Sequence, residues 1–372
     1  MRRATRDPIR QGSSEAPAAV RTRAQEGALG CPAHLALPML ALALFAGGCL
    51  GTDFDSPGLV RDTRILAVRL DPPEVELPTS PEEASLPLTA TVLVADPARG
   101  AVYLETRACR HATARACGDG DTEEELAELA AIHTATLEVP AAPAAPAAIF
   151  TDDRTLSQET LRALLFPPQG GVSLAGARPA YEVAAVGESG SEVAFKRLQI
   201  GLPDLLYRTL LAEAGLSICD ERGEPEGCVA YRTKVANRNP DLLGLEYRLE
   251  TSAGEDFDPV PEDAPLVVPS GAPVRLRPRV SEESYEAYQT ITIDFDSRTL
   301  HIEDRSEYLV FSWYATTGRL DFLQTEEERT LGIDNRWVAP TVDEEASAAV
   351  FVVVRDPRGG VDFRAVPILV RP

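Results

Sequence analysis

Short apolar stretches separated by proline- and glycine-containing turns constrain the fold of this chain more than any other feature. Leu86–Ala95 alternates apolar and small residues, Asp96–Gly100 turns the chain, and Ala101–Ala108 returns. A period of two over such a length indicates a strand with one buried face. Thirty prolines and 26 glycines fit many short strands joined by turns. The pattern predicts a β-meander that opens a β-sandwich.

The same pattern recurs to the end of the chain. The other segments with strand character are Thr63–Leu70, Tyr181–Val186, Glu192–Gly201, Val274–Val280, Tyr308–Tyr314, Ala348–Arg355 and Val361–Val370. Ala348–Arg355 is the most hydrophobic of them. We therefore expect a mainly all-β fold with two antiparallel β-sandwich domains, residues 63–202 and 231–372.

Three segments between the strands have helical character. Asp121–Ile132 carries acids in its first turn, where the helix dipole favours them. Thr155–Phe166 starts with a capping box, Thr155 to Gln158, and ends at two prolines. Pro203–Leu216 has proline at its first position. We expect the first two as insertions in the first domain and the third as a linker helix, which together with a cysteine loop fills residues 203–230.

The N-terminal region has the parts of an export signal. Arginines are frequent before residue 24, and Ala33–Ala46 is an almost unbroken apolar run. As a helix this run measures about 21 Å, which is short of the roughly 30 Å core of a bilayer. A basic flank, a short apolar core and small residues after it are typical of a signal peptide. Residues 1–48 are therefore predicted to be removed.

The small residues end in a cysteine, and Phe45-Ala46-Gly47-Gly48-Cys49 resembles the lipobox of bacterial lipoproteins. The resemblance implies a lipid on Cys49, a polar tether over residues 49–62 and location at the outer membrane, facing the periplasm or the cell surface. Two departures are Ala46, where leucine is usual, and the long basic region before the apolar run. The alternative is an ordinary signal peptide cleaved near Gly48.

Four further cysteines form two local pairs, Cys109 with Cys117 and Cys219 with Cys228. Four cysteines allow three connectivities, of which the local one is the simplest. An exported chain meets an oxidising compartment, so disulfides are expected. Zinc is the alternative, but the spacings are not C-x₂-C and His111 is the only imidazole within either pair.

The net charge of −22 argues against a nucleic-acid partner, because neutralising phosphates requires a basic surface. Cation binding is a weaker expectation. Asp294 and Asp296 flank Phe295, and on a strand residues two apart point to the same side, so their carboxylates would face one structural Ca²⁺. The alternative is solvated charge that protects a sheet edge.

The late strands carry a second resemblance. The Trp313 strand followed by Ala315-Thr316-Thr317-Gly318, and the pattern VVVRDPRGG over Val352–Gly360 before the last strand, are similar to bacterial Ig-like and PKD-type sandwich domains. Taken whole, the chain resembles outer-membrane lipoproteins of Gram-negative bacteria that carry such domains. The resemblance implies a fold and a location, and it implies no reaction.

The sequence offers no catalytic motif and no catalytic residues. After Cys49 the chain has His111, His133 and His301, without G-x-S-x-G, H-E-x-x-H or a P-loop. We therefore expect a non-enzymatic envelope lipoprotein with a binding or structural role, whose partners would be the membrane and envelope proteins or glycans. One alternative is a carbohydrate-binding adhesin that stacks sugars on Trp337, with Trp313 in the core. The other is a hydrolase with a site in residues 121–166.

Overall fold

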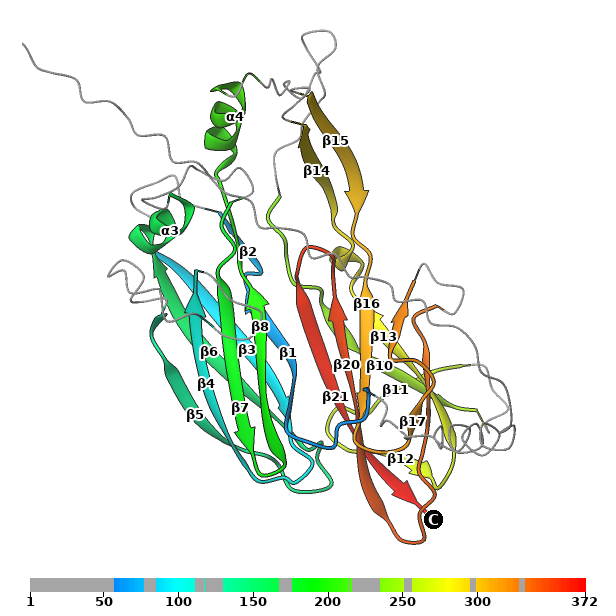
Figure 1. The fold of residues 1–372 in the computed structure, drawn as a ribbon. Helices are drawn as coiled ribbons and strands as arrows, with labels where there is room; N and C mark the ends of the chain where they lie inside the picture. The colour runs from blue at the N-terminus through cyan, green and yellow to red at the C-terminus, as the bar shows by residue number, and fades with distance from the viewer. Residues whose placement is uncertain are drawn as a thin grey trace, which may run out of the picture. The chain divides into compact units, whose positions relative to one another are not determined.

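The structure is a computed structural model that describes residues 57–76, 85–110, 117, 130–166, 176–213, 215, 235–250, 256–294, 299–327 and 332–372. Asp55–Pro372 form one compact unit by their internal contacts. The fold is all-β, as predicted: antiparallel sheets make up most of it (Figure 1). The helices within the described ranges are α3 (Gln158–Leu165), α4 (Asp204–Glu213) and the 3₁₀ helix η2 (Glu282–Ser284).

Two sheets face each other in the first half of this unit, which we call the N-terminal sandwich. One sheet has the order β1 (Arg64–Asp71), β3 (Ser85–Ala95), β6 (Ala147–Ser157). The other has the order β5 (His133–Glu138), β4 (Ala101–Cys109), β7 (Ala180–Gly187), β8 (Gly190–Arg197). Inward side chains of both sheets, among them Val92 and Leu104, form one buried core. A short parallel pair, β2 (Glu74–Glu76) and β9 (Gln199–Gly201), lies beside them.

Two larger sheets form the C-terminal sandwich. Their orders are β11 (Asp258–Pro259), β10 (Leu242–Leu249), β13 (Pro273–Val280), β19 (Asn335–Val338), β17 (Arg319–Leu320), and β12 (Leu266–Pro269), β21 (Val361–Arg371), β20 (Ala346–Arg355), β16 (Val310–Ala315), β18 (Gln324–Glu326). Trp313 and Trp337 lie in the core between the sheets. Strands β14 (Ala287–Asp294) and β15 (Thr299–Ser306) form a separate hairpin.

A third apolar cluster joins the two sandwiches, and we call it the shared cluster. Its buried members are Val60, Leu66, Ala67, Leu93, Ala95, Ala349, Phe351, Val353 and Val361. On β20 the even-numbered Val350, Val352 and Val354 face the core of their own sandwich. Phe351 and Val353 face the other sandwich. A strand buried on both faces has no polar phase, which is why Ala348–Arg355 is the most hydrophobic strand of the chain.

Hydrogen bonds surround the shared cluster. The Arg69 guanidinium lies 3.0 Å from the Asp362 carboxylate, and the Asn239 side-chain amide donates to the Leu70 carbonyl at 2.7 Å. These bonds satisfy polar groups at the edge of the apolar contact, where burial without a partner would be costly. The sandwiches are thus held by both apolar and polar contacts.

Three local expectations were wrong. Strands β3 and β4 belong to different sheets, so residues 86–108 cross between sheets and form no meander. Thr155 lies in β6, which pairs with β3 along its whole length. The cap of α3 is Ser157, whose hydroxyl accepts from the Thr160 amide, so the capping box at Thr155 does not form. Residues 130–166 therefore contain framework strands where insertions were expected.

The end of the segment expected as a tether, residues 49–62, lies against β16. The Val60 amide donates to the Ala315 carbonyl at 2.8 Å, and the Ala315 amide donates to the Gly58 carbonyl. The Val60 side chain is fully buried in the shared cluster. Burial of the apolar Val60 side chain thus stabilises the contact between the end of this segment and β16. The boundaries of the two domains remain predictions.

Candidate functional site

Several residues singled out in the sequence lie outside the described part of the chain: Cys49, Cys219, Cys228 and Asp296. The lipid on Cys49, the second cysteine pair and the paired carboxylates therefore remain predictions. Most of Asp121–Ile132, the first expected helix, lies outside it as well.

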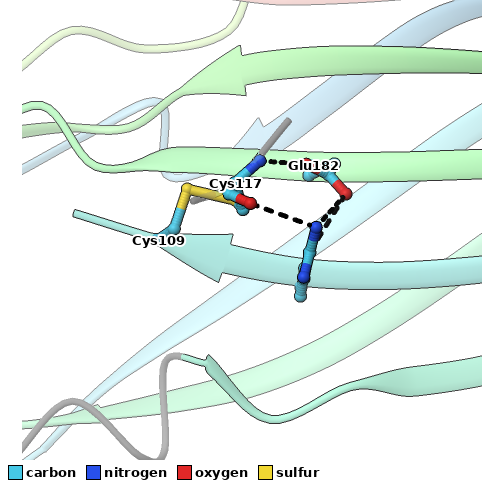
Figure 2. The surroundings of a disulfide bond; sticks show 4 residues. Cys109, Cys117 and Glu182 are labelled. Carbon is cyan, nitrogen blue, oxygen red and sulfur yellow. Dashed lines mark hydrogen bonds and ion pairs between the residues drawn. A yellow bond between two sulfur atoms is a disulfide. The ribbon is translucent and has the colours of Figure 1, made fainter. Parts of the chain in front are cut away.

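The Cys109–Cys117 disulfide is confirmed, with 5.7 Å between the two Cα atoms (Figure 2). Cys109 ends β4, and Glu182 of β7 accepts a hydrogen bond from the Cys117 amide at 2.5 Å. The Arg107 guanidinium bridges this site, since it contacts Glu182 at 3.0 Å and the Cys117 carbonyl at 3.3 Å. The disulfide thus holds a loop end against two neighbouring strands.

Trp337 is not a stacking platform for sugars. Its side chain is fully buried between the sheets of the C-terminal sandwich, and its indole N–H donates to the Thr317 carbonyl at 2.9 Å. A ring with no exposed face has no surface for a sugar, so the structure contradicts this expectation. Trp313 is also fully buried, as predicted, and donates to Thr325.

Asp294 ends β14, opposite Thr299 of β15, and is exposed. Asp294 is therefore on a strand, as expected. Among the described residues no group of three or more His, Cys, Asp or Glu side chains is arranged to hold a metal ion.

A polar cluster, which sequence reasoning missed, takes three of its five residues from the region 121–166 that was proposed for a hydrolase site. We call it the polar cluster: Thr106, His133, Asp152, Arg154 and Tyr181. Asp152 Oδ2 accepts from the Thr106 hydroxyl at 2.8 Å, from Arg154 Nε at 2.9 Å and from the Tyr181 hydroxyl. Asp152 Oδ1 lies 2.5 Å from His133 Nδ1. The cluster joins β4, β5, β6 and β7, and so links both sheets of the N-terminal sandwich.

Electrostatics keep Asp152 ionised. Burial by itself would raise the pKa of Asp152, but hydrogen bonds from Tyr181, His133, Thr106 and Arg154 outweigh it and lower the pKa to about 2. Burial and the bond to Asp152 raise the pKa of Tyr181, so that its hydroxyl stays a donor. The signal was present in the sequence, because Asp152 and Arg154 occupy the inward phase of β6, where apolar residues are expected.

The members of the polar cluster form one hydrogen-bonded network around Asp152. A histidine oriented by a buried carboxylate is one half of a nucleophile-activating pair, and the His133 side chain is 41% exposed. The printed sequence offers no catalytic motif around it, and within the described ranges no Ser or Cys side chain forms a hydrogen bond with His133. Fully satisfied polar networks of this kind specify one packing arrangement.

A cavity lies at the junction of the two sandwiches, and we call it the junction cavity. Its volume is about 730 Å³, within the roughly 300–1,000 Å³ typical of small-molecule sites. Residues of β8, β9 and α4 form one side, residues of β14 form another, and the turn between β20 and β21 closes it. Both charged and aromatic side chains line it.

Arg358 holds this turn in place. Its guanidinium contacts Glu307 at 2.7 Å, pairs with Glu286, and donates to the Val235 carbonyl at 3.0 Å. It also lies 4.8 Å from the centre of the Tyr288 ring. Burial raises the pKa of Glu307 to about 7, the Arg358 bond opposes this effect, and the Asp356 charge adds to it. The hydrogen bonds and ion pairs of Arg358 therefore stabilise the turn between β20 and β21.

Comparison with known proteins adds little. The chain matches no known protein-family model and no curated protein. Among solved structures, a bacterial adhesin from Mobiluncus mulieris with intramolecular disulfide, isopeptide and ester cross-links is 11% identical, covering 83% of this chain and 99% of the adhesin, with a TM-score of 0.25. The titin domains Z1Z2 in complex with telethonin are 10% identical (84% and 98% covered, TM-score 0.18). Latent PorU from Porphyromonas gingivalis is 9% identical (84% and 24% covered, TM-score 0.18). At such TM-scores the likeness carries no argument, so the sandwich fold is inferred from the sheets themselves.

Proposed function

We propose that this protein is an exported, non-enzymatic protein of the bacterial envelope, held to the outer membrane by a lipid on Cys49, with a binding or structural role. The observation that carries the proposal is the Cys109–Cys117 disulfide, in a chain whose leader ends in a lipobox-like Phe45–Cys49. Disulfides persist in oxidising compartments such as the periplasm and the cell surface. No helix among the described residues is long and apolar enough to cross a bilayer.

The shared cluster supports a binding or structural role. It fixes two sandwiches as one unit through side chains that are fully buried, such as Phe351 and Val353. A rigid body of this kind presents surfaces of both sandwiches in a constant geometry, which lowers the entropic cost of binding a partner. The glycan alternative lost its supporting residue when Trp337 proved to be buried.

Metabolic labelling with an alkynyl palmitate analogue in a Gram-negative host tests the anchor. Wild type should be labelled and Cys49→Ser should not, because the thiol that carries the lipid is gone. Cys31→Ser is the matched control: Cys31 lies in the predicted leader and its loss should leave labelling unchanged. Equal labelling of wild type and Cys49→Ser would contradict the anchor.

A turnover assay tests the non-enzymatic part. Fluorogenic esters, glycosides and peptides should remain intact with the wild-type protein. Turnover by wild type that disappears in His133→Ala would contradict the proposal, since His133 is the exposed member of the polar cluster.

A further inference from the structure

The junction cavity has a charge that differs from that of the whole chain. The chain carries a net charge of −22, yet three cations line this cavity from the β8–β9 side: Arg178, Lys196 and Arg197. Cations that cluster around a cavity create a local positive potential, even on a protein whose net negative charge repels anions elsewhere. This contrast points to an anionic ligand.

Both acids that line the cavity have partners of their own. Asp204 lies 2.7 Å from the Arg208 guanidinium. Glu74 accepts from the Asn237 amide at 2.9 Å and lies 3.8 Å from Arg358. Among the described residues neither carboxylate forms an ion pair with the three cations.

The cations contact neutral oxygens. Lys196 Nζ donates to the Gly359 carbonyl, and Arg178 Nε donates to the Gln199 side-chain oxygen at 2.6 Å. Among the described residues none of the three cations forms an ion pair with a carboxylate. An ammonium group has three donors, so Lys196 retains capacity for further acceptors.

Lys196 is also partly removed from water. Burial lowers the pKa of Lys196 to about 8, although the charge of nearby Asp356 opposes the shift. Asp356 itself is engaged by the Asn237 amide and by the backbone N–H groups of Arg358 and Gly360. An anion that enters the cavity would stabilise this desolvated ammonium by electrostatic attraction.

The rest of the cavity wall is suited to an apolar body. Leu202 and Tyr207 line it near α4, and Tyr288 and Ile291 line it from β14. Ligand sites commonly combine such a lining with a few polar groups that fix orientation. We propose that the junction cavity binds a small organic anion, with its carboxylate or phosphate group at Lys196 and Arg197 and its apolar body against Tyr207 and Tyr288. This goes beyond the proposed envelope role, which would hold without it.

Calorimetry with the detergent-extracted protein tests the charge requirement. The probes are 4-phenylbutyrate, its neutral amide 4-phenylbutanamide, and 4-phenylbutylamine. The carboxylate should bind at least about tenfold more tightly than the amide, because hydrogen bonds to charged groups are the stronger ones. Phenyl phosphate against phenylacetate distinguishes a phosphate from a carboxylate head group. Equal affinity for anion and amide, or no binding of any anion, would overturn the proposal.

A variant pair locates the site. Lys196→Met keeps the aliphatic stem and should weaken 4-phenylbutyrate about tenfold, whereas Arg371→Met, an exposed cation that pairs with Glu345, should not change it. If Lys196→Met does not fold, Arg197→Met replaces it, and unchanged affinity in the folded variant overturns the assignment.

A spectroscopic measurement needs no variant. The chain has two lysines, Lys196 and Lys234, so selective labelling of lysine side chains gives two signals. Saturating 4-phenylbutyrate should raise the pKa of one of them, since an anion stabilises the charged ammonium. If 4-phenylbutyrate leaves the titration curves of both lysines unchanged, the placement of the anion at Lys196 is contradicted.

Discussion

Phe351 tests whether the two sandwiches are coupled. It is fully buried on β20, and it faces Leu66 and Leu93 of the other sandwich in the shared cluster. Phe351→Ala removes an aromatic ring from that contact. Phe-to-Ala changes at such buried positions cost ~3–5 kcal/mol, and here the loss falls on the contact between the sandwiches.

Phe311→Ala is the matched control. Phe311 is also fully buried, but it packs in the core of the C-terminal sandwich. Urea unfolding should show comparable losses of ~3–5 kcal/mol for both variants. Under native conditions, hydrogen exchange by mass spectrometry should separate them. Phe351→Ala should speed exchange of the backbone amides of β1 and β3, and Phe311→Ala should leave those amides near the wild-type rate.

Coupling through the shared cluster is contradicted if Phe351→Ala leaves the β1 and β3 amides as protected from exchange as in wild type. Lost stability without faster exchange in those strands would mean that the shared cluster stabilises the C-terminal sandwich alone. The proposed rigid two-sandwich body would then lose its physical basis.

Three further predictions concern single residues. Gly318 has φ +79°, and a Cβ added there would lie 2.5 Å from the Val338 carbonyl oxygen. Gly318→Ala should therefore lower the thermal stability more than Gly332→Ala, since Gly332 has φ +65° and no atom within 4 Å of an added Cβ; equal losses would contradict this. Burial raises the pKa of Glu307 from 4.5 to about 7, so its contribution to the free energy of unfolding falls as pH rises through that interval, by at most ~1.4 kcal/mol per pH unit. Urea unfolding of Glu307→Gln at several pH values should lack this pH dependence; a dependence equal to that of wild type would refute the assignment. The lowered pKa of Asp152 gives stability that is lost as pH falls from 3.8 to about 2, and Asp152→Asn should lose this acid dependence and cost ~3–5 kcal/mol at pH 7; a variant as stable as wild type would contradict it.

Much of the strand pattern could be predicted from the sequence, because a strand with one buried face carries its own signal. The alternation in Leu86–Ala95 and Val274–Val280 identified β3 and β13 within a residue or two. Helix α4 was recognised from its terminal signals, with proline at its start. Strand β6 was missed because Asp152 and Asp153 interrupt its apolar alternation.

The arrangement of the strands could not be predicted locally. The apolar run on β20 identified a strand, but the residues that cover its second face, Leu66 and Leu93, lie far earlier in the chain. The same limit applies to the sites. Lys196 belongs to a cavity only because β8 meets β14 and the β20–β21 turn in three dimensions. Trp337 was misjudged because its loop-like sequence gave no sign of the β13 and β17 strands that flank it.

The intact mass of the protein extracted from membranes tests the proposed lipid on Cys49. We expect a polypeptide that begins at Cys49 and carries the additional mass of its acyl chains, with the Cys109–Cys117 disulfide intact. A polypeptide that begins elsewhere and carries no lipid would contradict it, and the protein would then be a secreted or periplasmic β-sandwich without an anchor.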